Sequence, residues 1–392
     1  MKENCAKNRA ASTEILKISS ISEVGAATGR FSIRNQMARL LSFSALSSFR
    51  LGGVWVALLA ARGFTMAQIG IAEGVFHIAS LLFEIPSGVI SDVFGRKYSL
   101  ICSRLMGMIS SLLMVVSRGL PGVCLALVFG AFSYNFESGA REALAYDSLK
   151  AHGKEESYLG YSSLDMAIYR VGSASAYLMA GLSLALGYQI ANLLDAGMDF
   201  VCLLLALGFK EVRLEPAQHA ESAGKRIAAC VRESVGFLIT QTQARRIMLA
   251  NAFAGAIAIL LSFFLQAQLP LAGLKNAYLG PALFVMGLGG AAGARIALRF
   301  AKMRYKRLYA LCLGGTLLGL AMGVSGMPLV MVAGGFAAGM FDDLLQVRTD
   351  SLLNNQFPSE QRATLVSVSS LCFSLVMIAM SPLAGWFFDG LR

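Results

Sequence analysis

One short turn holds the side chains best placed to form or break contacts between helices. The stretch at residues 84–97 reads EIPSGVISDVFGRK, so Asp92 closely precedes Arg96 and Lys97 at the end of an apolar run. A carboxylate at the end of one helix can pair with basic side chains or bind the positive end of another helix. Gly95 permits a tight reversal of the chain between two helices. The turn therefore predicts a charged hinge.

Further ionisable side chains lie inside apolar runs. Glu84 precedes Asp92 by about two helical turns, so the two share a helix face. Glu137 and Arg141 are four residues apart and can pair along a helix. Charges are costly in lipid, so those inside a membrane protein are functional candidates or internal ion pairs. The candidates for proton or substrate binding are Glu84, Arg50, Glu137, Arg141, Asp165 and Asp342.

These candidates leave alternatives open. Glu137 and Arg141 either pair to tie helices together or contact a substrate. Asp342 either faces a central cavity or lies at the cytoplasmic end of its helix. Asp195 and Asp199 are expected near the outer surface.

Composition indicates what kind of molecule carries these groups. The 392 residues are 56% hydrophobic and only 15% charged, and the mean hydropathy is +0.62. Soluble domains are about 25% charged. A membrane span needs about 20 mainly apolar residues, and we predict an all-α polytopic membrane protein with eleven spans. They are expected at 40–60, 66–90, 98–117, 121–147, 160–187, 189–209, 247–268, 277–299, 308–326, 328–349 and 362–388.

The basic residues predict how the chain is oriented. With the N-terminus inside, 26 of the 34 Lys and Arg residues fall in cytoplasmic segments and four in outer segments. Such an excess is typical of cytoplasmic loops, and it accounts for the net charge of +11 without a nucleic-acid partner. The predicted units are a cytoplasmic tail (1–36), a six-helix bundle (37–209), a cytoplasmic linker (210–246) and a five-helix bundle (247–392).

Two motifs carry a family resemblance. The stretch at 84–97 resembles the GxxxDxxGRK signature of the major facilitator superfamily (MFS), and the stretch at 138–149 resembles the SGxxxAxxYDSL pattern of a subset of that family. All five positions of the first motif match: Gly88, Asp92, Gly95, Arg96 and Lys97. The resemblance implies two helix bundles around a central cavity, which open alternately to either side of the membrane. A twelfth span, usual in this family, is missing from the predicted set.

The resemblance also implies roles for the hinge. Asp92 would contact the start of the final helix, near 360–364, and hold the cytoplasmic side closed. We expect Gly88 to let two helices approach closely. Asp147 lies within reach of Arg96, so the gating motif is extended by this sixth residue.

The expected function is transport of a small molecule, with protons as the coupling ion and export as the direction. An uptake symporter, a non-transporting sensor and a degenerate paralogue remain alternatives. The sequence shows no catalytic motif, no metal-binding pattern and no nucleotide site, so we expect neither an enzyme nor a bound cofactor. The expected partners are the substrate, protons and the lipid bilayer of the cell membrane, and the expected state is a monomer.

Overall fold

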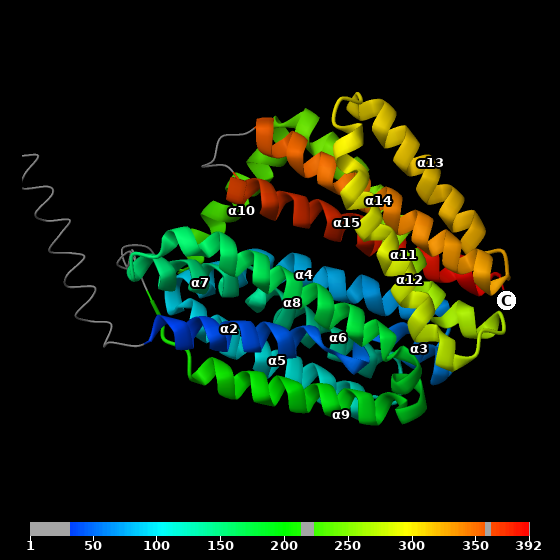
Figure 1. Cartoon of the computed structure of the whole chain (residues 1–392), viewed down its shortest axis with the longest axis horizontal. Coiled ribbons are helices and arrows are strands. Elements are labelled where there is room, and N and C mark those ends of the chain that lie inside the picture. Colours follow the sequence, from blue (N-terminus) through cyan, green and yellow to red (C-terminus); the bar gives the residue numbers. More distant parts are fainter. Residues whose placement is uncertain (1–31, 213–222, 357–361, 392) are drawn as a thin grey trace, which may run out of the picture.

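The computed structural model describes residues 32–212, 223–356 and 362–391, and these residues contain helices and connecting turns but no strand. The all-α prediction is therefore confirmed for the described part of the chain. Figure 1 shows the helices lying roughly side by side. The α-helices are α2 (Ile33–Ser48), α3 (Trp55–Ala61), α4 (Met66–Phe94), α5 (Arg96–Val116), α6 (Leu120–Glu137), α7 (Ala140–Ala151), α8 (Tyr158–Leu178), α9 (Ala180–Leu207), α10 (Ala223–Thr240), α11 (Thr242–Leu271), α12 (Asn276–Ile296), α13 (Tyr305–Gly323), α14 (Pro328–Gln356) and α15 (Arg362–Asp389).

Most of these helices can cross a bilayer. Nine segments of the described chain are long and apolar enough to do so: Ile33–Ala61, Met66–Phe94, Arg96–Val116, Leu120–Ala151, Ala180–Leu207, Thr242–Leu271, Asn276–Phe300, Pro328–Gln356 and Ser367–Asp389. Two further helices, α8 and α13, lie where the sequence predicts the remaining two spans. The count of eleven stays a prediction.

The helices form two groups. Helices α2–α9 pack against one another, and we call them the first bundle; α11–α15 do the same and form the second bundle. In Figure 1 the blue-to-green helices of the first bundle lie below the yellow-to-red helices of the second. Helix α10 lies between the bundles in sequence and contacts α4, α11 and α15.

The two bundles meet most extensively where α4 packs against α15. The helices run antiparallel, since Gly70 of α4 lies against the Ser381 carbonyl of α15, whereas Glu84, further along α4, interacts with the Ser370 hydroxyl. We name the two ends of the molecule by α4: the Met66 end, where α4 begins, and the Gly95 end, where it has just ended.

Two predicted spans are broken near their middles. The first is interrupted at Phe49 and Arg50, which have extended backbone between α2 and the 3-10 turn Leu51–Val54 that leads into α3. The fourth is interrupted at Ser138 and Gly139, and Gly139 has φ +72°, a conformation that favours glycine. Non-helical backbone at membrane depth occurs where it is buried in protein or lines a cavity.

Candidate functional site

A chain of ion pairs connects the two breaks, and we call it the charge network. Arg50, in the first break, binds Asp199 of α9 through both guanidinium nitrogens, at 2.5 Å and 3.0 Å. Asp199 also accepts a hydrogen bond of 3.1 Å from Arg104 of α5, whose other nitrogen pairs with Glu137 at the end of α6. The network then continues through Arg141 of α7.

Arg141 lies just after the second break and has several partners. Its guanidinium lies 3.6 Å from Glu137, 3.2 Å from Asp165 of α8 and 3.1 Å from Glu142. It also donates a hydrogen bond of 3.1 Å to the Ser44 hydroxyl of α2. Four of the sequence candidates, Arg50, Glu137, Arg141 and Asp165, therefore belong to a single network.

The centre of the network is inaccessible to solvent. Arg104 is 2% exposed and Asp199 is 1% exposed, so the expectation that Asp199 lies near the outer surface is wrong. Taking charges out of water costs several kcal/mol per ion, which only close pairing and further hydrogen bonds offset. Arg104 gains such support from the Ser103 hydroxyl and from the ring of Phe43, over which its guanidinium lies at 5.2 Å.

Asp195 stabilises the first break in a different way. Its two carboxylate oxygens accept hydrogen bonds of 2.9 Å from the backbone N–H groups of Leu51 and Gly52. These N–H groups begin a new helical segment and have no partner within it. Asp195 is 4% exposed, so it too lies inside the bundle and not near the outer surface. A buried carboxylate at a helix start is favourable because the helix dipole is positive there.

A polar pocket of about 260 Å³ adjoins the network. Arg50 and Glu137 keep 29% and 24% of their side chains exposed, in contrast to Arg104. The lining combines these two charged groups with several hydroxyls: Ser47, Arg50, Arg104, Gly107, Ser110, Ser111, Gly130, Ser133, Tyr134 and Glu137. Such a lining offers both hydrogen-bond donors and acceptors to a small polar molecule.

The acids of the second bundle have a different setting. Asp342 of α14 faces α11 at Gly255, and within the described residues it forms no ion pair. The neighbouring Asp343 faces α12 at Gly290 and experiences the positive charge of Arg170 from α8 of the first bundle. Glu84 lies at the α4–α15 interface, near the Ser370 hydroxyl, and is likewise without an ion pair among the described residues.

The predicted hinge forms part of its expected contacts. Arg96 pairs with Asp147 of α7 and donates a hydrogen bond of 3.1 Å to the Ala143 carbonyl. A partner that the sequence did not suggest is Glu211, whose carboxylate accepts hydrogen bonds from the backbone N–H groups of Arg96 (3.0 Å) and Lys97 (2.7 Å). Glu211 thus binds the start of α5.

Gly95 is required here for two reasons. Its φ of +113° is unfavourable for residues with a side chain, and a Cβ atom there would lie 2.8 Å from the Glu211 carboxylate carbon. Gly88 differs, because a Cβ at that position would meet nothing within 4 Å among the described atoms. The expected close helix contact at Gly88 stays a prediction, whereas Gly70, earlier in α4, lies directly against the Ser381 carbonyl of α15.

The remaining hinge residue, Asp92, is exposed and forms no ion pair with any described residue. Of its predicted contact residues near 360–364, residues 360 and 361 and the side chains of 362–364 lie outside the described part of the chain. The antiparallel packing of α4 and α15 brings the end of α4 to the level at which α15 begins. The Asp92 contact stays a prediction.

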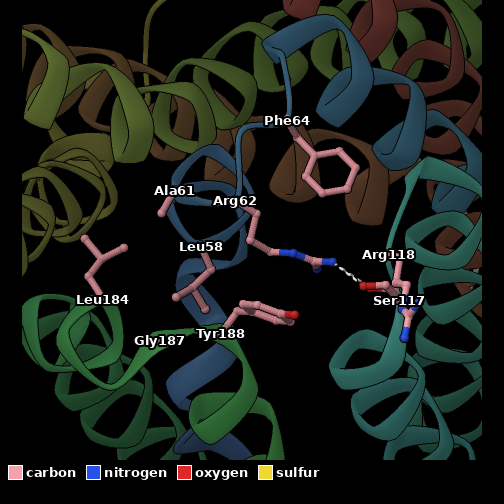
Figure 2. A pocket seen from close by; sticks show the side chains of 9 residues that line it. All are labelled: Leu58, Ala61, Arg62, Phe64, Ser117, Arg118, Leu184, Gly187 and Tyr188. Carbon is pink, nitrogen blue, oxygen red and sulfur yellow. Dashed lines mark hydrogen bonds between the residues drawn. The ribbon is translucent and has the colours of Figure 1, made fainter.

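A separate pocket of about 590 Å³ lies at the Met66 end (Figure 2). Arg62 extends across it, with its guanidinium 4.0 Å from the Tyr188 ring and 5.1 Å from the Phe64 ring. It donates hydrogen bonds to the backbone carbonyl and the hydroxyl of Ser117, at 2.5 Å and 3.1 Å, and Figure 2 shows the Arg62 side chain directed at Ser117. Burial lowers the pKa of Arg62. These contacts join two connecting segments and helix α9 of the first bundle, and Arg62 takes no part in the charge network.

Comparison with known proteins decides the family. A family model for the Major Facilitator Superfamily matches residues 38–305, which is more than half of the chain. The chain belongs to the major facilitator superfamily. An uncharacterized MFS-type transporter, YxaM of Bacillus subtilis (strain 168), is 22% identical over 344 residues, covering 85% of this chain and 84% of YxaM. The chain is therefore a member of a multi-pass membrane transporter family and not an enzyme.

Solved structures show the same fold. The nucleoside transporter NupG superimposes with a TM-score of 0.72 at 14% identity, and 91% of each chain is covered. A D-xylose-proton symporter superimposes with a TM-score of 0.66 at 11% identity, covering 91% of this chain and 90% of that one. At such low identity the likeness shows the shared MFS fold alone.

Sequence reasoning missed Arg104 and Asp199 as members of this MFS chain's network. Both are charged residues inside apolar runs, the same signal that identified Arg50 and Arg141. Their pairing joins α5 to α9, 95 residues apart, which spacing cannot reveal. Glu211 was missed because it lies in a polar stretch, where an acid is unremarkable.

Proposed function

We propose that this protein is a secondary active transporter that exports a small polar metabolite by alternating access, with protons moving in the opposite direction. The observation that carries the proposal is the charge network, which connects the breaks of two spanning helices. In transporters, discontinuous helices at corresponding positions of two repeats mark substrate and ion sites. The polar pocket beside Arg50 and Glu137 has the size and chemistry to contact a small polar solute.

We assign proton binding to acids that lie outside the charge network. Asp199, Glu137 and Asp165 are each already paired with at least one guanidinium. Glu84, at the α4–α15 interface, and Asp342, which faces α11 within the second bundle, have no such partner among the described residues. Neutralisation by a proton removes the cost of a buried, unpaired charge. A change in their protonation would therefore alter the free energy of moving one bundle against the other.

The proposed orientation places the Gly95 end in the cytoplasm. Arg96 and Lys97 lie at that end, and the linker with its basic residues begins there. Cytoplasmic segments of membrane proteins are enriched in Lys and Arg. The Met66 end then faces outward, in the cell membrane.

The test is flux through purified protein in proteoliposomes with an imposed pH gradient, measured with a panel of radiolabelled polar metabolites and a pH-sensitive dye. We expect substrate movement to be coupled to proton movement. Glu84→Gln should reduce gradient-driven flux at least about tenfold and leave exchange of labelled for unlabelled substrate intact, because exchange requires no net proton release. Glu155→Gln, at an exposed acid outside the spans, is the matched control and should behave as wild type.

Three outcomes would contradict the proposal. Proton and solute movement in the same direction indicates an uptake symporter, and inverted vesicles distinguish the two directions. Binding of a solute without flux indicates a sensor. Unchanged gradient-driven flux in Glu84→Gln removes Glu84 from the coupling mechanism.

A further inference from the structure

The last residue of α15 binds the first residues of α4. The Asp389 carboxylate accepts hydrogen bonds of 2.8 Å from the backbone N–H of Met66 and of 2.8 Å from that of Ala67. The first N–H groups of a helix have no partner within the helix. A carboxylate there satisfies two of them and interacts favourably with the helix dipole.

Each side of this contact is anchored in a different bundle. Phe388, next to Asp389, stacks on Phe264 of α11 at 5.0 Å, and its carbonyl accepts a hydrogen bond from Gln268 of the same helix. Asp389 is therefore fixed to the second bundle. Met66 is 0% exposed and follows the short loop from α3, so it is fixed to the first bundle.

The backbones on either side approach closely. A Cβ atom on Gly70 would clash with the Ser381 carbonyl, and one on Gly385 would clash with the Met66 carbonyl. At the same end Gly181 lies against the Asn276 carbonyl, which joins α9 to α12 of the second bundle. The bundles are therefore in tight contact at the Met66 end, and they cannot separate there without breaking the two Asp389 hydrogen bonds.

Asp389 differs from the other acids that bind helix starts. Asp195 binds the segment at Leu51 and Glu211 binds the start of α5, and both contacts lie within the first bundle. Contacts inside a bundle persist when the bundle moves as a rigid body. The Asp389 contact crosses between bundles, so its free energy is present only while the Met66 end is closed.

We propose that Asp389 is a gating residue that holds the Met66 end closed, as the mirror image of the contact predicted for Asp92 at the Gly95 end. Asp389, at the C-terminal end of α15, binds the start of α4, and Asp92, near the C-terminal end of α4, is predicted to bind the start of α15. Antiparallel packing places the two contacts at opposite ends of the same interface. The inference rests on the proposed alternating access: opening one end breaks one contact, and closing the other end forms its counterpart.

The test measures closure directly by pulsed electron spin resonance distances in lipid nanodiscs. Spin labels are placed at Arg118→Cys and Lys275→Cys, exposed positions in loops of the first and second bundles, in a transport-competent background whose native cysteines are replaced. We expect wild type to show mainly the short distance. Asp389→Ala should raise the ratio of the long-distance to the short-distance population about tenfold, the weight of one hydrogen bond to a charged group. Asp389→Asn should shift it less, because the amide retains one acceptor.

The matched control is Gln68→Ala. Gln68 and Thr65 exchange hydrogen bonds at the same helix start and form none with the described residues of the second bundle. This control should leave the distances unchanged. An equal shift in Gln68→Ala would show that Asp389 acts only as a helix cap. An unchanged distance distribution in Asp389→Ala would contradict the gating role. The distance measurement needs no substrate, so it is independent of the flux measurement. If the wild-type protein shows no flux but Asp389→Ala still shifts the distances, the transport proposal is contradicted and the closing contact is retained.

Discussion

The two bundles are stabilised by different kinds of interaction. In the first bundle, buried guanidinium and carboxylate groups compensate one another across five helical segments, and two spans are broken. In the second, helices approach through glycines: Gly289 and Gly293 of α12 lie directly against carbonyls of α14, and Gly319 of α13 lies against Gly334. Its buried polar contacts join neutral groups, such as Asn251 with Gln346 and Thr349.

The difference separates two tasks of a transporter. Ion pairs between several helices fix the positions of the charged side chains, so the first bundle can present a fixed pattern of charge to a substrate. An acid without a counter-ion can bind and release a proton at lower cost, and Asp342 has that setting in the second bundle. The comparison therefore predicts that disrupting the network unfolds the protein, whereas neutralising Asp342 leaves it folded.

The largest effect is expected from Asp199→Leu. The substitution leaves Arg50 and Arg104 without their shared carboxylate, and Arg104 is almost fully buried. Removing one partner from a buried ion pair costs about 3–5 kcal/mol. Thermal unfolding in detergent, followed by size-exclusion fluorescence, should show a large loss of folded protein. Asp199→Asn, which keeps a hydrogen-bond acceptor of the same shape but removes the charge, should lose somewhat less; wild-type stability in Asp199→Asn would contradict the electrostatic explanation.

A smaller loss is expected from Gly293→Ala in the second bundle. A methyl group there would meet the Met340 carbonyl, so α12 and α14 must move apart. Overpacking of this kind costs about 1–3 kcal/mol. Gly197→Ala in α9 is the matched control, because a Cβ there meets no described atom within 4 Å. The same thermal assay should show lower stability for Gly293→Ala and unchanged or higher stability for Gly197→Ala.

The sequence predicts those features that depend only on residues close together along the chain. The hinge motif, the long apolar helices and four members of the charge network are all recognisable from residue type and spacing. The structure confirms the ion pair between Glu137 and Arg141, although a helix break lies between them. The transporter family is confirmed as well.

The remaining features depend on packing between distant segments. The break at Arg50 has no proline to mark it; extended backbone persists there because Asp195, more than 140 residues away, binds the N–H groups that follow. The contacts of Glu211 and Asp389 with helix starts also join residues far apart in sequence, 115 and 323 residues respectively.

The smallest effect on stability is expected from Asp342→Asn. The carboxylate forms no ion pair among the described residues, so an amide of the same shape removes a charge without leaving a buried partner uncompensated. The free energy of unfolding should change by no more than about 0.5 kcal/mol in either direction, which is the range of ordinary surface substitutions. Flux driven by a pH gradient should nevertheless fall, whereas exchange of substrate at equal pH persists. A large loss of folded protein would show that Asp342 has a structural role, and it would contradict the proposed difference between the two bundles.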